Sequence, residues 1–171
     1  SEPQLQLRLP TERYYEEEGR AELTPRDFGI LMHRVFENAA TTDEIYTAIE
    51  AMTQDGVLDE KEAPRLRELV EKALADPVTA EWFGGRWQVV RNENEIILPG
   101  SGTTRRPDRV MTDGERAVVV DYKFGDRETA RHRKQIREYL RLLRQMGYTR
   151  TEGYLWYVRL GRTERVEEKE D

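Results

Sequence analysis

Arg106-Pro107-Asp108-Arg109 and Val118-Val119-Val120-Asp121-Tyr122-Lys123 are the two stretches that decide the fold of this 171-residue chain. Between them, Asp113-Gly114 is a strong signal for a hairpin turn. Ala117 to Val120 is a continuous apolar run, which is typical of a central strand buried on both faces. Together the two stretches predict consecutive strands of one hairpin in the interior of a sheet.

Strand alternation places Asp121 and Lys123 on one face, because side chains two residues apart point the same way. Tyr122 then points to the opposite face, and the hairpin brings Asp108 to about the level of Asp121. Two carboxylates and a lysine at the end of a buried strand are costly without a cation or a substrate. We therefore expect a divalent metal ion beside a phosphate here. The alternative is a surface hairpin with an ordinary Asp–Lys pair.

The composition indicates a polar chain that is long enough for one domain with a sizeable core. Charged residues make up 36% and hydrophobic residues 37%, and no apolar stretch approaches the length of a membrane span. There are no cysteines, which excludes disulfides, thiolate zinc sites, iron–sulfur clusters and cysteine nucleophiles in this chain. The absence of cysteine agrees with a cytoplasmic location, where thiols are kept reduced.

The net charge of −6 by itself argues against a nucleic-acid binder, but the charges are unevenly distributed along the chain. Acidic residues concentrate in Glu16–Glu18 and Glu167–Asp171, whereas residues 127–150 are strongly basic and include Arg131 and Lys134. The basic stretch is either a solvated helix face or a local phosphate-binding surface that the whole-chain charge hides. Both interpretations stay open.

The predicted elements are a group of helices, a strand meander, a long helix and a final strand. We expect residues 1–23 to be a lead-in segment from a larger chain, and residues 24–171 to form one domain. The helices are predicted over residues 24–39 (capped by Thr24), 42–52 (capped by Thr42-Asp43), 59–75, 77–83 and 127–146. The strands are predicted over residues 87–90, 95–98, 105–111, 117–123 and 153–160.

Three further side chains lie where they could join the two aspartates. His33 follows Gly29 by four residues on the first helix, and a neutral imidazole is a good metal ligand. Gln135 and Tyr139 share a helix face at spacing i, i+4. A lone histidine is more often a core or surface residue, and such a pair by itself means little. These residues gain weight only if they converge with the aspartates.

Five short motifs in order resemble the RecB-type branch of the PD-(D/E)XK nucleases. They are Gly29-x3-His33, Glu93 within residues 91–96, Pro107-Asp108, Asp121-Tyr122-Lys123 and Gln135-x3-Tyr139. The resemblance covers roughly residues 24–160. It is closest to the nuclease domain at the C-terminus of RecB- and AddA-like bacterial helicases of the UvrD/Rep superfamily. It implies an α/β fold with a restriction-endonuclease-like core: a mixed central sheet flanked by helices, with residues 42–75 as an N-terminal helical insertion.

The resemblance also implies a role for each matching residue. The implied metal ligands are His33, Asp108, Asp121 and the backbone carbonyl of Tyr122. Lys123 corresponds to the catalytic lysine, and Glu93 matches an acidic position on an early strand, with Glu95 as a close competitor. Gln135 and Tyr139 match the supporting motif, and Arg131 and Lys134 are candidate DNA contacts. Hard oxygen ligands favour Mg²⁺, with Mn²⁺ as a substitute, and no iron–sulfur cluster is expected.

The implied activity is Mg²⁺-dependent hydrolysis of DNA phosphodiesters. The expected context is an exonuclease attached to an ATP-dependent helicase that acts in double-strand break repair and recombination. No G-x4-G-K-[ST] loop occurs in the sequence, so the motor is expected on further sequence or on a partner subunit. A non-cleaving DNA-binding module and a stand-alone restriction or repair endonuclease stay open as alternatives. The plainest alternative is a helical domain with a coincidental hairpin.

Overall fold

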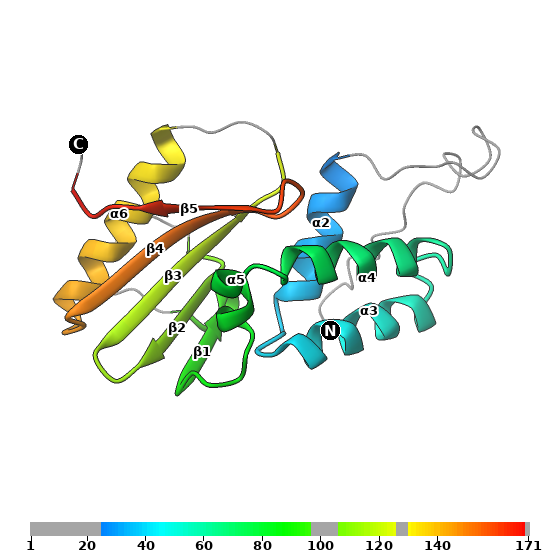
Figure 1. Ribbon diagram of the computed structural model, residues 1–171, viewed down its shortest axis with the longest axis horizontal. Coiled ribbons are helices and arrows are strands. Elements are labelled where there is room, and N and C mark those ends of the chain that lie inside the picture. The colour runs from blue at the N-terminus through cyan, green and yellow to red at the C-terminus, as the bar shows by residue number, and fades with distance from the viewer. Residues whose placement is uncertain (1–24, 97–105, 126–129, 170–171) are drawn as a thin grey trace.

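The computed structural model describes residues 25–96, 106–125 and 130–169, and within these ranges five strands form one mixed sheet (Figure 1). The strands follow one another across the sheet in chain order: β1 (Val89–Asn92), β2 (Arg109–Asp113), β3 (Arg116–Lys123), β4 (Arg150–Tyr157) and β5 (Arg162–Val166). Only β3 and β4 are parallel, and every other neighbouring pair is antiparallel.

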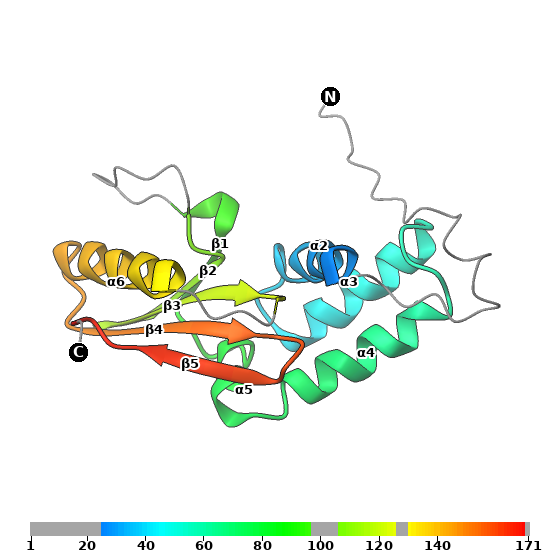
Figure 2. The same ribbon diagram turned by 90° about the horizontal axis from the view of Figure 1, so that it is seen from above.

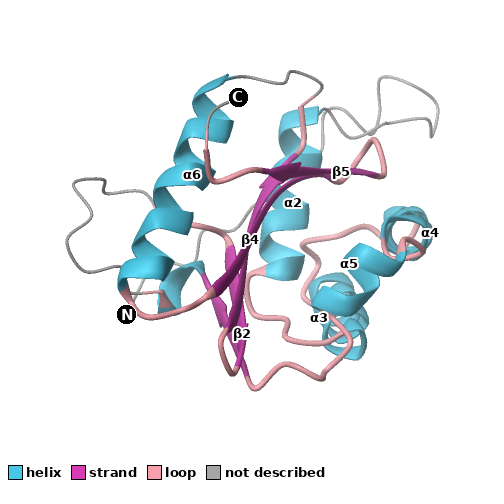
Figure 3. Cartoon of the chain, turned by 60° about the vertical axis from the view of Figure 1, so that its left-hand side comes forward, coloured by secondary structure: helices cyan, strands magenta, loops and turns pink. Residues whose placement is uncertain are grey.

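Helices lie on both faces of this sheet. They are α2 (Pro25–Phe36), α3 (Thr42–Gln54), α4 (Glu62–Ala73), α5 (Pro77–Trp82) and α6 (Ala130–Gln145). Figure 3 shows the sheet nearly edge-on, with α6 on one side and α2 to α5 on the other. In Figure 2, α3 and α4 extend beyond the sheet. This is the predicted α/β architecture, a mixed sheet flanked by helices as in a restriction-endonuclease-like core.

The central strand β3 is buried on both faces, as its apolar run predicts. Val118, Val120 and Tyr122 pack into the core beneath α2 to α5. Ala117 and Val119 pack into the second core, beneath α6. Alternation therefore sends the side chains that follow Val119 along the strand, first Asp121 and then Lys123, toward the α6 side of the sheet.

The close approach of α6 to β4 depends on Gly153. A Cβ atom at this position would overlap Ile136 Cγ2 and would lie 3.2 Å from both methyl carbons of Leu140. Ile136 and Leu140 are both buried on α6 and cannot withdraw into solvent. Glycine is therefore required here by the distance between helix and strand rather than by its backbone conformation.

We expect Gly153→Val to lower the free energy of unfolding by about 1–3 kcal/mol, because it overpacks a close-packed interface. Urea unfolding measures the effect. Gly125→Val is the matched control, since a Cβ at Gly125 meets nothing within 4 Å. Equal stability of the two variants would mean that α6 moves away from β4 at little cost.

Several strand boundaries differ from the prediction, and one predicted strand is absent from the part of it that is described. β1 and β2 lie two and up to four residues later than residues 87–90 and 105–111. The strand predicted over residues 95–98 is not formed in its described part, because Glu93–Glu95 is a 3₁₀ helix, η1. The Glu95 carboxylate accepts a hydrogen bond from the Asn92 backbone N–H (3.3 Å), which favours a turn over an extended chain. Residues 97–98 lie outside the described residues.

The predicted hairpin turn is present but is displaced by one residue. Its two loop residues are Gly114 and Glu115, between the paired Asp113 and Arg116. Gly114 has φ 58°, a left-handed conformation that glycine adopts without strain.

The chain beyond α6 also differs from the prediction. β4 begins at Arg150 rather than Gly153 and ends at Tyr157, and β5 was not predicted at all. β5 is a mostly polar edge strand, and Arg133 on α6 holds it through an ion pair with Glu164 (2.6 Å). Because contacts with other elements stabilise β5, its own sequence shows little of the apolar alternation that predicts a strand.

All five predicted helices are present, with ends that differ by a few residues. The N-cap of α3 is Thr41 rather than Thr42, because the Thr41 backbone is extended and its hydroxyl accepts from the Glu44 N–H (3.3 Å). Asp76 caps α5 by accepting from the Val78 N–H (2.8 Å). The Thr24 cap, residues 126–129 and the lead-in segment lie outside the described residues.

Candidate active site

The start of β2 and the end of β3 hold two carboxylates in a reciprocal arrangement. The Asp108 backbone N–H donates to Asp121 Oδ1 (3.0 Å). The Tyr122 backbone N–H donates in turn to Asp108 Oδ2 (2.7 Å). Each carboxylate therefore has one oxygen fixed by a backbone amide of the neighbouring strand. This pairing joins the Pro-Asp motif to the Asp-x-Lys motif, as their predicted positions in one hairpin require.

Lys123 lies beside this pair at the end of β3. Its Nζ atom is 4.0 Å from Asp121 Oδ2, and the exposed fractions of the two residues are only 8% and 2%. A lysine and an aspartate two residues apart share a strand face, so this contact follows from local periodicity. The cation is thus held at the edge of the acidic pair with little access to water.

His33 reaches the same place from α2. Its Nδ1 atom lies 3.6 Å from Asp108 Oδ1. Its ring packs against the rings of Tyr122 and Phe124, at centroid distances of 5.8 and 5.0 Å. Gly29, one helical turn earlier, lets α2 approach the end of β3, since a Cβ there would be 3.3 Å from Phe124 Cβ. The spacing Gly29-x3-His33 thus has a packing reason, and Phe124 is a contact that sequence reasoning missed.

The charge of the acidic pair is costly in the metal-free protein. Burial and, next in size, the negative charge of Asp121 raise the pKa of Asp108 to about 8. The Tyr122 backbone N–H and, more weakly, the Lys123 ammonium act in the opposite direction on this pKa. The neighbouring groups therefore neutralise only part of the negative charge of the two carboxylates. A bound cation would neutralise the rest.

We expect Asp108→Asn to stabilise the metal-free protein at alkaline pH. Folded Asp108 keeps its proton up to about pH 8, whereas the ordinary carboxyl pKa is 3.8. The folded state binds more protons between these values, so the free energy of unfolding falls as pH rises through this window. Asp108→Asn has no carboxyl group to ionise at this position. Its free energy of unfolding at pH 9 should therefore exceed that of wild type by about 1–3 kcal/mol.

Thermal unfolding in EDTA at pH 5, 7 and 9 tests this expectation. The exposed Asp113, at the far end of the same hairpin, supplies the matched control Asp113→Asn. An Asp108→Asn variant with the same pH dependence as wild type would contradict the raised pKa.

The two competing glutamates of η1 take different positions. The charge of Glu93 raises the pKa of Asp108, so this side chain lies within electrostatic reach of the acidic pair. Glu95 instead binds the backbone of Asn92 and lines a separate pocket. Burial raises the pKa of Glu37, and Glu93 adds to the rise. Glu37 is a further acid that sequence reasoning missed, although its spacing of four residues from His33 was a usable signal.

The donor groups fit a hard divalent cation, although they do not form a closed metal site. Within the part of the chain that the structure describes, no three His, Asp or Glu side chains are grouped so that they could hold a metal ion. The carboxylates of Asp108 and Asp121 nevertheless supply oxygen donors, and His33 adds an imidazole beside Asp108. Carboxylate oxygens suit Mg²⁺ and Mn²⁺, and the raised pKa of Asp108 shows that positive charge is lacking there.

The motif on α6 supports the strand that carries Asp121. Tyr139 is buried with Val119 and Leu155 beneath α6, whereas Gln135 is half-buried one turn earlier. Arg131 and Lys134 are exposed near the start of α6 and do not contribute to this core. The i, i+4 pair therefore faces the sheet, and the basic residues face outward.

Arg109 is the most unexpected residue near the site, because it is completely buried. Its guanidinium donates to the backbone carbonyls of Ala39 (2.5 Å), Ala40 (2.8 Å) and Trp82 (2.7 Å). It also lies 3.9 Å from the ring centroid of Phe83. Arg109 thus connects β2 by hydrogen bonds to the segment after α2 and to the end of α5. No local pattern in the sequence signals this role.

The sequence model of the PD-(D/E)XK nuclease superfamily matches residues 4–171. The match covers nearly the whole chain, so this protein belongs to the PD-(D/E)XK nuclease superfamily. Members are nucleases, which hydrolyse phosphodiester bonds, act on DNA and generally use divalent metal ions. No curated protein sequence matches the chain significantly. Among the described residues, none of the helices has the length and apolar character needed to cross a membrane.

Proposed function

We propose that this domain is a Mg²⁺-dependent deoxyribonuclease, with Mn²⁺ as a substitute metal. The observation that supports this most directly is the reciprocal Asp108–Asp121 pair with Lys123 Nζ 4.0 Å from Asp121. Desolvation and then the negative charge of Asp121 raise the pKa of Asp108, a cost that a purely structural hairpin would have no reason to bear.

His33, Asp108, Asp121 and the backbone carbonyl of Tyr122 are the groups that would hold the ion. When bound, the metal lowers the pKa of a water molecule and neutralises charge on the phosphate. The backbone amides of Asp108 and Tyr122 keep the carboxylates oriented before substrate arrives. Lys123 presents a nearly buried ammonium that stabilises the negative charge developing on the phosphate oxygens.

The charge distribution explains how a chain of net charge −6 attracts DNA. Residues 130–150, which contain α6, carry seven arginines and lysines against one glutamate. Residues 42–76, which contain α3 and α4, carry ten acidic against four basic residues. These two regions lie on opposite sides of the sheet (Figure 3). We propose that DNA approaches along α6, where the exposed Arg131 and Lys134 contact its phosphates.

The resemblance to RecB- and AddA-like proteins suggests the wider context. We propose that the domain works as an exonuclease with an ATP-dependent helicase motor in double-strand break repair. A non-cleaving DNA-binding module fits less well, because Asp108, Asp121 and Lys123 are all present and close together. A stand-alone restriction or repair endonuclease differs in the products it makes, since it cuts at internal sites.

Cleavage of end-labelled single- and double-stranded DNA in Mg²⁺, Mn²⁺ or EDTA tests the proposal. Metal-dependent hydrolysis supports it, and the ladder of products separates exonuclease from endonuclease action. If the domain cuts nothing by itself, calorimetric titration with Mn²⁺ decides between a motor-dependent nuclease and a binding module. Binding that is lost in Asp121→Asn supports the nuclease, whereas no Mn²⁺ binding by wild type overturns the catalytic assignment.

A further inference from the structure

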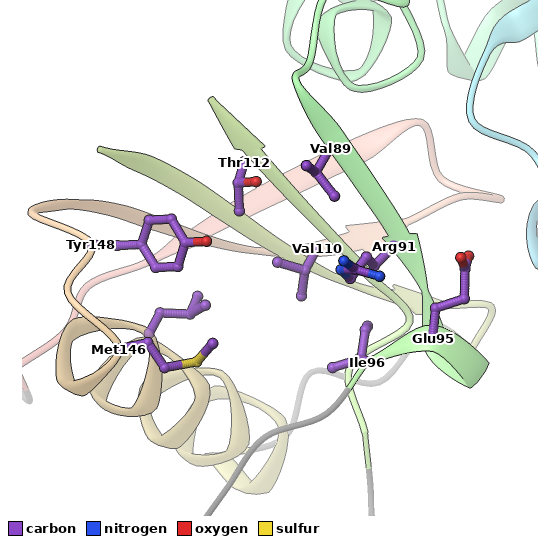
Figure 4. Close-up of a pocket in the computed structure, with 9 residues that line it drawn as sticks. Val89, Arg91, Glu95, Ile96, Val110, Thr112, Met146 and Tyr148 are labelled. Carbon is purple, nitrogen blue, oxygen red and sulfur yellow. The ribbon is translucent and has the colours of Figure 1, made fainter. Parts of the chain in front are cut away.

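A pocket of about 320 Å³ lies on the α6 side of the sheet, between the end of α6 and the strands β1 and β2 (Figure 4). Tyr148 and Met146 form one side, Val110 and Arg91 face them from the sheet, and Ile96 faces them from the end of η1. The remaining lining residues are Val89, Glu95, Thr112 and Leu143. The walls are thus mainly apolar, with one aromatic ring and a few polar groups.

Two cross-strand pairs form the floor of the pocket and connect it to the candidate active site. Val89 lies opposite Thr112, and Arg91 lies opposite Val110. Val110 in turn pairs with Val119 on β3, and Asp121 is two residues further along that strand. Two residues of a strand span roughly 6.6 Å and share a face. Val110 therefore lies on the same face of the sheet as Asp121. Tyr148 lies toward the other end of β3, because Arg150, two residues later, pairs with Arg116, which is five residues before Asp121.

The end of α6 fixes the aromatic side of the pocket. Gly147 has φ 106°, and the Tyr148 N–H donates to the Leu143 carbonyl (3.2 Å), so the chain turns back toward the sheet at this point. Met146 stays 49% exposed at the rim of the pocket. α6 itself makes its main sheet contacts with β3, β4 and β5, and the pocket lies beside it over β1 and β2.

The chemistry of the lining fits a nucleobase. An aromatic ring offers a stacking surface to any base, and apolar walls favour a flat ring that has left water. The Arg91 guanidinium, the Glu95 carboxylate and the Thr112 hydroxyl supply donors and acceptors for the polar edge of a base. A base that is stacked and paired within a duplex cannot enter such a pocket without being extruded.

We infer that this pocket binds one unpaired base of the DNA strand whose phosphate is held at Asp108, Asp121 and Lys123. The inference rests on the proposed nuclease function and narrows its substrate class to single-stranded DNA or frayed ends. Tyr148 is the stacking residue, and Arg91 contacts the edge of the base or its phosphate. Duplex DNA binds through the basic surface of α6 alone and gains nothing from the pocket.

Photocrosslinking gives a direct test with the wild-type chain. A single-stranded oligonucleotide carrying 5-iodouracil is irradiated with the protein in EDTA, where no cleavage occurs, and the tryptic peptides are identified by mass spectrometry. We expect the crosslink in the peptide Gln145–Arg150, which contains Met146 and Tyr148. Failure to bind the oligonucleotide, or crosslinks only in other peptides, would overturn the inference.

Binding of matched variants provides the second readout. Tyr148→Ala should weaken binding of a fluorescent single-stranded oligonucleotide in EDTA about 5- to 100-fold, and should leave binding of a blunt duplex unchanged. Tyr46→Ala is the control, because Tyr46 is a half-buried tyrosine on α3, on the opposite side of the sheet. An equal loss for single strand and duplex, or no loss for either, overturns the inference.

The cleavage assay keeps the two proposals separate. A chain that cuts DNA, with Tyr148→Ala cutting single strands at the wild-type rate, retains the nuclease function and loses the base pocket. A chain that cuts nothing and binds no Mn²⁺, but crosslinks through Gln145–Arg150, retains the base pocket and loses the catalytic assignment.

Discussion

Lys123→Met is expected to slow DNA cleavage about 100- to 1000-fold, because it removes a cation placed where the transition state gains negative charge. The site geometry makes a large effect reasonable: Lys123 is nearly buried, and its Nζ atom lies 4.0 Å from Asp121 Oδ2. Methionine has a similar length and no charge, so the packing at the end of β3 should be kept. Single-turnover cleavage of labelled DNA at saturating metal measures the chemical step.

Asp121→Asn should lose at least as much activity, and it should also lose Mn²⁺ binding in calorimetry. The matched controls are Lys61→Met and Asp113→Asn, which change exposed residues outside the candidate active site. Both should cleave at the wild-type rate. If Lys123→Met kept more than about a tenth of the rate, its role in the transition state would be refuted, since even one lost oxyanion-type donor costs more.

Arg109→Met is expected to destabilise the fold by about 3 kcal/mol or more, the largest stability effect that we expect from a single substitution. It leaves the carbonyls of Ala39, Ala40 and Trp82 without their shared donor, and the bonds to Ala39 and Trp82 are buried. Each buried carbonyl that loses its partner costs about 1–3 kcal/mol. The contact of the guanidinium with the Phe83 ring is lost as well.

Urea unfolding of Arg109→Met beside Arg106→Met measures this effect. Arg106 is exposed three residues earlier, so its substitution should change the free energy of unfolding by less than about 0.5 kcal/mol. If Arg109→Met were as stable as this control, water or another donor would be satisfying the three carbonyls. The buried Arg109 would then contribute little to the free energy of unfolding.

Local periodicity in the sequence was enough to predict the central elements. The apolar run before Asp121 predicted that β3 is a strand buried on both faces, and the two-residue spacing placed Lys123 beside Asp121. Asp76-Pro77 predicted the start of α5, and the apolar spacing predicted the long α6. These features depend on neighbours within a few residues, so the sequence contains the whole signal.

Short polar segments were predicted poorly because distant partners decide their structure. Glu95, predicted to begin a strand, instead ends the 3₁₀ helix η1. The unpredicted β5 is positioned by Arg133 of α6 and by pairing with β4. The motif residues alone also left open whether His33 reaches the aspartates. The answer depends on how closely α2 approaches β3, which Gly29 and Phe124 control.

The sequence by itself determined the type of fold, the order of the main elements and the pairing of Asp121 with Lys123. Only the tertiary structure decided that Arg109 is buried, that Gly153 lets α6 touch β4, and that Tyr148 closes a pocket on the α6 side of the sheet. The physical reason is the range of the interactions. Alternation and capping act between near neighbours, whereas burial and close approach depend on segments that meet only after the chain has folded.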